Sequence, residues 1–175
     1  MEIRPAQLED LPACAQLDGS YQTDWVWQME AHSHGAETRV AFRPMRLPRT
    51  LTVPYPLDEI VLEWDWRHEE CFLVAEEDDE ILGCLDMRIQ PWERLGWIYH
   101  LVVDRSHRRR GLGTALLRAG MEWAREEGLR SVMLQVATKN YPAIQFAQRR
   151  GFTFCGYSDL YFASRDIALF FARGL

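Results

Sequence analysis

The stretch VVDRSHRRRGLGT, residues 102–114, decides the fold of this chain. A short apolar strand runs into a basic loop, and two glycines, Gly111 and Gly113, open an amphipathic helix. Backbone N–H groups at a helix start are unpaired, and the helix dipole adds positive potential there. Glycine lets an anion approach this backbone because no Cβ stands in the way. The segment therefore predicts a cradle for a pyrophosphate group, reinforced by the three arginines at 108–110.

Two other phosphate-binding motifs fit this segment less well. A P-loop needs a lysine directly after its second glycine, and Thr114 follows Gly113 here. A dinucleotide fingerprint needs three spaced glycines, and Arg108 stands where the first would be. The plain alternative is a solvated basic loop in front of a helix that begins at glycine.

Hydrophobic periodicity around this segment predicts strands alternating with helices. Downstream of residue 70 we expect strands at 71–76, 80–90, 96–104, 131–136, 152–162 and 166–171, and helices at 111–127 and 140–150. Upstream we expect an extended segment at 2–5, a helix at 7–19, a strand at 23–30, and strand, loop and turn over 32–58. This order predicts an α/β mixed sheet with helices on its faces.

Residues 108–113 resemble the R/Q-x-x-G-x-G/A acetyl-CoA loop of the GNAT superfamily of N-acetyltransferases. Downstream, NYPAIQF at 140–146 and RGF at 150–152 are similar to the second signature of that family, in which an Asn-capped helix ends at Gly-Phe. The resemblance covers residues 71–163 well and the first 70 residues loosely. From Trp97 onward the sequence looks like the branch of streptothricin acetyltransferases and ribosomal-protein N-terminal acetyltransferases.

The resemblance implies one GNAT domain over residues 1–175, built on a central mixed sheet of about seven strands that is splayed in the middle. Residues 1–70 would form a divergent acceptor-side half, 71–163 the cofactor-binding core, and 164–175 a C-terminal strand. The implied co-substrate is acetyl-CoA. The residues implied to contact it are Val102, Val103, Arg108, Arg109, Arg110, Gly111, Leu112, Gly113, Thr114, Asn140, Ala143 and Phe146.

Acetyl transfer to an amine asks for an acid that assists the leaving thiolate. In many family members a tyrosine directly after the position of Phe146 supplies it, and here that residue is Ala147. Three alternatives follow from this difference. Tyr141, Tyr157 or Tyr161 reaches the sulfur, the thiolate leaves unassisted, or the protein binds acetyl-CoA without transferring the acetyl group.

The reaction also asks for a base, because an amine must lose its proton before it attacks. His100 is the first candidate, since histidine accepts protons near neutral pH. Asp86 and Glu93 are further candidates, and a base acting through water would leave no motif.

Tryptophans gather in the first part of the chain, where six of the seven precede residue 98. Trp25 and Trp27 form a W-x-W pair, as do Trp64 and Trp66, and each pair shares a face if its segment is a strand. Aromatic faces beside carboxylates form a cage for an alkylammonium group, although core packing explains the same residues. We expect Trp25, Trp27 and Tyr99 to contact the acceptor.

Composition limits the classes of partner. A net charge of −6 argues against general nucleic-acid binding and suits a cationic substrate, while 47% hydrophobic residues support a real core. The four cysteines lack metal-site spacing and predict small buried hydrophobes in a reduced, cytoplasmic protein with no metal. The charged N-terminal residues do not resemble a signal peptide, and no apolar run approaches a membrane span.

These observations predict an enzyme that transfers acetyl from acetyl-CoA directly to the primary amine of a small cationic molecule. The alternatives are a protein N-terminal or lysine acetyltransferase and a non-catalytic acyl-CoA-binding domain. The apolar end at 167–171 predicts either an edge strand that supports a homodimer or simply core.

Overall fold

The computed structural model describes residues 1–68 and 71–175, which form two compact units. Unit 1 comprises Met1–Ser20, Pro54–Gln135 and Ala172–Leu175, and unit 2 comprises Tyr21–Val53 and Val136–Phe171. Within the described ranges, no helix is both long and apolar enough to cross a bilayer.

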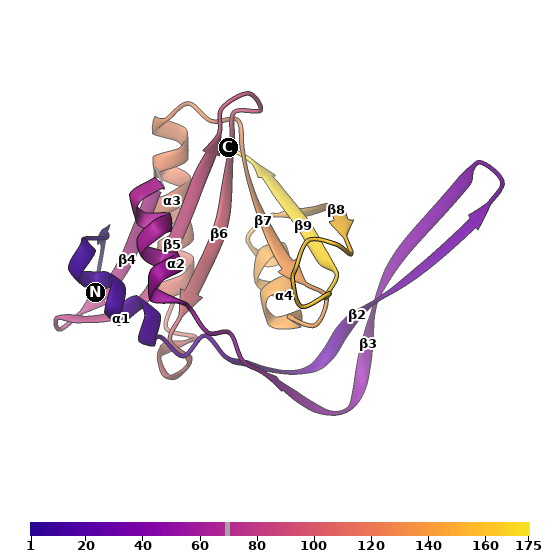
Figure 1. Cartoon of the computed structure of the whole chain (residues 1–175), viewed down its shortest axis with the longest axis horizontal. Helices are drawn as coiled ribbons and strands as arrows, with labels where there is room; N and C mark the ends of the chain where they lie inside the picture. The colour runs from indigo at the N-terminus through magenta and orange to yellow at the C-terminus, as the bar shows by residue number, and fades with distance from the viewer. Residues whose placement is uncertain (69–70) are drawn as a thin grey trace. The chain divides into compact units, whose positions relative to one another are not determined.

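Seven strands form one mixed sheet in the order β1-β4-β5-β6-β7-β9-β8 (Figure 1). They are β1 (Glu2–Pro5), β4 (Cys71–Glu77), β5 (Glu80–Gln90), β6 (Leu95–Val103), β7 (Ser131–Ala137), β8 (Thr153–Ser158) and β9 (Ala168–Gly174). The strands β1, β4, β5 and β6 pair antiparallel, and β6 pairs parallel with β7. The predicted α/β class and the mixed sheet of about seven strands are confirmed.

The position of β9 corrects one expectation. It lies between β7 and β8, so residues 167–171 are not at an edge of the sheet. Ala168, Leu169 and Phe171 are fully buried, which agrees with the alternative that this end is core.

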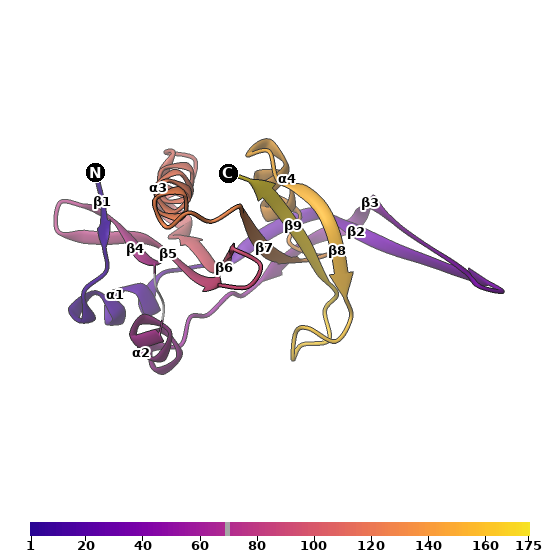
Figure 2. The same cartoon turned by 90° about the horizontal axis from the view of Figure 1, so that it is seen from above.

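In unit 1, helices cover both faces of the strands. The helices α1 (Leu11–Gln16) and α2 (Glu59–His68) lie on one face of β4 and β5, and α3 (Leu112–Glu126) lies on the other (Figure 2). The expected helix at 7–19 is instead a 3-10 turn followed by the short α1, whose first turn contains Pro12. Proline has no N–H for an intrahelical bond and therefore fits only the start of a helix.

The helix α2 was not predicted, and its presence corrects the strand interpretation of Trp64 and Trp66. Residues two apart lie on different sides of a helix, so these rings do not share a face. The ring of Trp64 stacks on His68, while the indole of Trp66 donates a hydrogen bond to the Ala6 carbonyl at 3.0 Å.

The pairing of β6 with β7 stops early. The parallel register runs from Leu95↔Ser131 to Ile98↔Leu134, although β6 continues to Val103. On its other side β6 carries a bulge, because the β5 partners Asp86 and Met87 face His100 and Ile98 and leave Tyr99 in excess. A bulge bends its strand and re-aims the neighbouring side chains.

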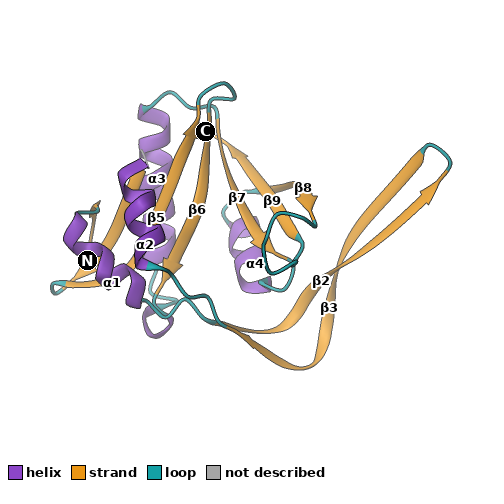
Figure 3. Cartoon of the chain, in the orientation of Figure 1, coloured by secondary structure: helices purple, strands orange, loops and turns teal. Residues whose placement is uncertain are grey.

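Unit 2 contains a two-stranded antiparallel ribbon, β2 (Tyr21–His34) and β3 (Glu37–Val53), together with α4 (Tyr141–Arg149) (Figure 3). The strand expected at 23–30 is longer than predicted, and much of the segment expected as strand, loop and turn is strand β3. The base of the ribbon packs into an aromatic cluster of Trp27, Phe42, Phe154 and Phe171, with ring centroids 5.4 to 6.3 Å apart. This cluster is the apolar centre of unit 2.

Candidate functional site

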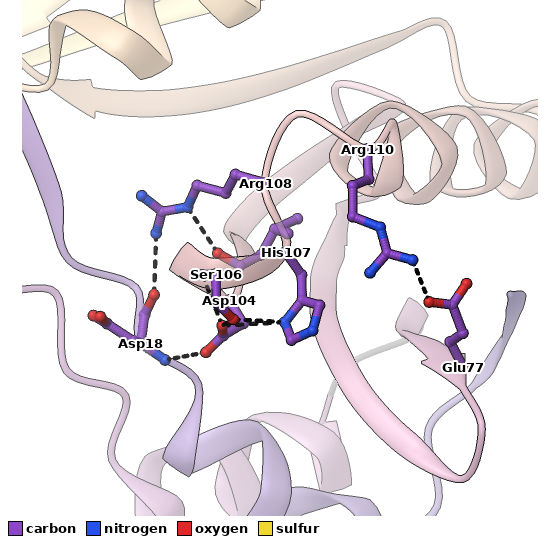
Figure 4. A network of polar contacts seen from close by, with 8 residues as sticks. Asp18, Glu77, Asp104, Ser106, His107, Arg108 and Arg110 are labelled. Carbon is purple, nitrogen blue, oxygen red and sulfur yellow. Dashed lines mark hydrogen bonds and ion pairs between the residues drawn. The ribbon is translucent and has the colours of Figure 1, made fainter.

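The loop that follows β6 in unit 1 is organised around the carboxylate of Asp104. It accepts hydrogen bonds from the backbone N–H of Asp18 at 3.0 Å and of Ser106 at 3.0 Å, and it lies 3.3 Å from the imidazole Nδ1 of His107 (Figure 4). Partial burial acts to raise the pKa of Asp104, but the hydrogen bond from the Ser106 hydroxyl, together with those from the backbone and from His107, outweighs it and lowers the pKa to about 2. The carboxylate therefore stays charged and joins the loop to the end of α1.

Arg108 is a second connection between the same two segments. Its guanidinium donates to the carbonyls of Val103 at 2.9 Å and Ser20 at 2.7 Å. It also donates to the carbonyl of Asp18 at 3.1 Å (Figure 4). The half-buried position of the group lowers its pKa by desolvation. Its side chain is thus committed to carbonyl groups, and what Arg108 offers to a bound phosphate is its backbone N–H.

The two arginines that follow differ in their partners. The guanidinium of Arg110 is paired with the carboxylate of Glu77 at 2.5 Å (Figure 4). Among the described residues, none accepts a hydrogen bond from the side chain of Arg109, which is exposed. Arg109 also has a φ of +66°. Of the three basic side chains in the predicted cradle, Arg109 is the cation available to an anion.

Gly111 begins α3 in a conformation that suits an anion-binding turn. Its φ is +94°, in the left-handed region, and a Cβ built on it would meet no heavy atom within 4 Å. Its carbonyl accepts from the N–H groups of Thr114 and Ala115, both at 3.0 Å. In the described part of the chain, the N–H groups of Leu112 and Gly113 have no acceptor. Open space at Gly111, next to two N–H groups that the helix leaves without an acceptor, fits the pyrophosphate of a coenzyme A molecule.

The second signature lies in unit 2, where Asn140 caps α4. Its side-chain oxygen accepts from the N–H of Ala143 at 3.2 Å, and its carbonyl accepts from Ile144 at 3.0 Å. This is the predicted Asn cap. Phe146 is half-buried, and Ala147 is 1% exposed. Ala147 therefore packs in the core, at the position where the resemblance led us to look for a tyrosine.

Two of the candidate bases, Asp86 and His100, lie together on neighbouring strands of unit 1. They are direct cross-strand partners, and the Nδ1 of His100 lies 3.1 and 3.2 Å from the two carboxylate oxygens of Asp86. The Asp86 side chain is fully buried, and that of His100 is 22% exposed. A carboxylate only accepts hydrogen bonds, so Nδ1 donates to Asp86, and in the neutral ring the lone pair then lies on Nε2. This is the carboxylate–imidazole arrangement that prepares a histidine to take a proton.

Tyr55 packs beside this pair and was not identified from the sequence. Its ring meets the His100 ring edge-on, with centroids 6.4 Å apart. Gly19 allows Tyr55 to approach closely, because a Cβ at Gly19 would stand 2.7 Å from the Tyr55 carbonyl. The remaining candidate base, Glu93, lies in the exposed turn between β5 and β6.

The acceptor candidates of unit 2 occupy two different surroundings. Trp25 is 39% exposed and stacks on Tyr141, with centroids 6.2 Å apart and planes 30° apart. Trp27 lies in the aromatic cluster instead, and Tyr157 meets Phe42 edge-on at 5.4 Å. Trp25 and Tyr141 thus form a partly exposed aromatic shelf. The predicted roles of Tyr141, Tyr157 and Trp27 remain predictions.

Tyr99, the acceptor candidate in unit 1, is held by several groups. The Arg88 guanidinium lies 4.6 Å from its ring centroid, and the Trp97 ring lies 6.2 Å away. Its carbonyl accepts a hydrogen bond from the Gln135 side chain at 3.2 Å. Gln135 is a contributor that sequence patterns did not indicate, because nothing in the local pattern shows where a glutamine points.

Three of the four cysteines, Cys14, Cys71 and Cys84, are buried as expected, but Cys155 is exposed, which corrects that expectation. Cys155 lies on β8, whose residues are mostly exposed.

A separate hollow of about 520 Å³ in unit 1 borders Asp104 but includes none of the candidate bases. Its lining includes Glu9, Glu76 and Glu80.

Comparison with known proteins gives consistent results. Residues 21–152 match the family model described as Acetyltransferase (GNAT) family. Streptothricin acetyltransferase from Streptomyces lavendulae is 29% identical over 160 residues, which cover 89% of this chain and 82% of that protein.

Solved structures show the same relation. The crystal structure of nourseothricin acetyltransferase has a TM-score of 0.86 and 30% identity, and the match covers 99% of this chain and 97% of that one. A structure from Bacillus anthracis str. Ames in complex with acetyl coenzyme A has a TM-score of 0.79 at 19% identity, with 99% of both chains covered. This last likeness is one of fold.

Proposed function

Because the chain belongs to the acetyltransferase (GNAT) family, we propose that it transfers an acetyl group from acetyl-CoA to the primary amine of a small cationic molecule. The relatives named for streptothricin and nourseothricin support a small-molecule acceptor. The net charge of −6 supports a cationic one. The four free thiols support a reducing, cytoplasmic setting.

The observation that carries the proposal is the pair of Asp86 and His100. His100 stands two residues before Val102, on the strand that leads into the cofactor loop. Family membership and the loop account for binding of the co-substrate, but a binding domain has no need of an imidazole held on a fully buried carboxylate. The pair therefore favours a catalyst over an acyl-CoA sensor.

The position and chemistry of each group give it a role in the proposed reaction. Asp86 holds the Nδ1–H of His100, and Nε2 takes a proton from the acceptor ammonium, so that the neutral amine nitrogen can attack the thioester carbonyl. The C–N bond forms and the C–S bond breaks, the acylated nitrogen gives up its second proton, and the departing thiolate takes up a proton. The N–H groups at the start of α3 and the side chain of Arg109 hold the pyrophosphate. Tyr141 and Tyr157 are the candidates to protonate the thiolate.

The test is thiol release from acetyl-CoA with a panel of streptothricin, aminoglycosides, polyamines, amino acids and short peptides. We expect release with a cationic small molecule. His100→Ala should lower kcat by about 10²- to 10⁴-fold, the usual contribution of an acid–base group. Asp86→Asn should lower kcat less, because the ring remains but its orientation is no longer held.

The matched control is His34→Ala, which removes an exposed imidazole at the tip of the β2–β3 ribbon. It should leave kcat unchanged. Release with peptides alone would favour a protein acetyltransferase. Coenzyme binding without release from any amine would contradict the proposal and favour a sensor, and an unchanged kcat in His100→Ala would remove His100 as the base.

A further inference from the structure

Beyond the last backbone pair of β6 and β7, a side chain of β7 still connects the two strands by hydrogen bonds. The last backbone partners are Ile98 and Leu134, and Gln135 is the next residue of β7. Its Oε1 accepts from the indole Nε1–H of Trp97 at 2.5 Å, and its Nε2 donates to the Tyr99 carbonyl at 3.2 Å. Because one partner donates and the other accepts, only one orientation of the amide satisfies both.

The carbonyl that Gln135 holds belongs to the bulge residue. Tyr99 has no partner on β5, since Asp86 pairs with His100 and Met87 pairs with Ile98. The β5 ladder therefore does not determine where Tyr99 lies. Its ring is placed by Arg88 and its carbonyl by Gln135, so the bulge is fixed from both sides.

We propose that Gln135 is a positioning residue for the catalytic base. By fixing the carbonyl of Tyr99, it fixes the peptide that leads into His100 and holds that imidazole on Asp86. The inference rests on the proposed function, in which His100 takes the proton from the amine. A displacement of about 1 Å in a reacting group costs up to about 10²-fold in rate, so a hydrogen bond one residue away has a measurable effect.

The first experiment needs no turnover. Gln135→Leu keeps a side chain of comparable volume and removes both hydrogen bonds. In NMR spectra of the unliganded protein, the indole N–H of Trp97 and the ring resonances of His100 should shift. Spectra of Trp97→Phe and His100→Ala assign these signals. The matched control is Gln148→Leu, the same change at an exposed position of α4, which should leave both signals in place.

His100 ring resonances that coincide in Gln135→Leu and in the unsubstituted protein would overturn the proposal. Gln135→Glu provides a second variant. It keeps an acceptor for Trp97 but turns a second acceptor toward the Tyr99 carbonyl, so it should shift the His100 signals as Gln135→Leu does. Signals that Gln135→Glu leaves in place would likewise contradict a role for the Nε2 donor.

The second experiment is kinetic and uses the amine that the enzyme acetylates. Gln135→Leu should lower kcat about tenfold or more while the KM for acetyl-CoA changes little. In a His100→Ala background the same substitution should cost less than twofold, because the group that Gln135 positions is gone. Equal factors in the two backgrounds would show that Gln135 acts independently of His100. Absence of turnover in the unsubstituted protein would instead contradict the proposed function, and the NMR comparison would still decide the role of Gln135.

Discussion

Arg108 and Arg109 are neighbours in the cofactor loop, yet their side chains have different surroundings. Arg108 donates to three backbone carbonyls, two of them in residues 18–20, whereas Arg109 extends from the loop without a partner among the described residues. A half-buried guanidinium with three acceptors stabilises the fold, and an exposed one is available to a ligand.

We therefore expect substitution of Arg108 to lower stability and substitution of Arg109 to lower the affinity for coenzyme A. Arg108→Gln should lower the free energy of unfolding by about 2 kcal/mol, because the carbonyls lose a charged donor. Arg109→Gln should leave that free energy unchanged and weaken coenzyme A binding about fivefold, roughly 1 kcal/mol. Urea unfolding and isothermal titration calorimetry measure the two quantities. The reverse pattern would mean that Arg108 is the phosphate ligand.

Asp104 gives a prediction about pH. Its pKa is lowered from 3.8 to about 2 in the folded chain, so the stability it adds is present above 3.8 and is lost as the pH falls toward 2. Asp104→Asn should lower the free energy of unfolding by about 1 kcal/mol at pH 6, since the group is partly solvated. In urea titrations the difference between the two proteins should shrink between pH 4 and pH 2.5. A difference that does not change over this range would contradict the assignment.

At the scale of elements, the start of α3 depends on one backbone conformation. Gly111 has a φ of +94°, which costs an L-residue about 1–2 kcal/mol, and the space in front of it is open. A side chain at this position would fill the space that we assign to the pyrophosphate. Glycine is thus required at this helix start for two separate reasons: the backbone needs a positive φ, and the bound pyrophosphate needs the space that a side chain would fill.

Gly111→Val should separate these requirements. We expect at least a tenfold weaker affinity for coenzyme A, measured by calorimetry, together with a small loss of stability. Gly35→Val is the matched control, because Gly35 also has a positive φ, +60°, and open space, but lies in the β2–β3 turn. It should lose similar stability and keep its affinity. Unchanged coenzyme binding in Gly111→Val would contradict the cradle.

At the scale of the whole molecule, the charge of −6 bears on the acceptor. A protein of this charge attracts cationic substrates from a distance. Salt screens this attraction, with a Debye length of about 10 Å at 0.1 M. For a cationic amine we expect kcat/KM to fall several-fold between 20 and 200 mM salt. A neutral amine of similar size should show no such fall. Equal salt dependence for both would contradict electrostatic selection of the acceptor.

Much of the cofactor side could be predicted from sequence because its signals are local. The glycines at 111 and 113, the Asn140 cap and the apolar periods after residue 70 each act within a few residues. They therefore predicted the strands, α3, α4 and the cradle. The acidic composition and the family signatures likewise indicated the reaction class before any contact was known.

The pairing that carries the catalytic proposal was decided by the tertiary structure. Asp86 and His100 were separate candidates, because the bulge at Tyr99 determines their register and no local signal marks it. Two partners of Arg108 lie 88 and 90 residues away in the chain. The three arginines, which look equivalent in the sequence, therefore differ: Arg108 connects two segments, Arg110 pairs with Glu77, and Arg109 is the available cation. Periodicity and propensity act over a few residues, whereas hydrogen bonds between distant segments form only when the chain is packed. For that reason the sequence by itself predicted the fold class and a cradle for coenzyme A, whereas only the tertiary structure placed His100 beside Asp86 and Arg108 on distant carbonyls.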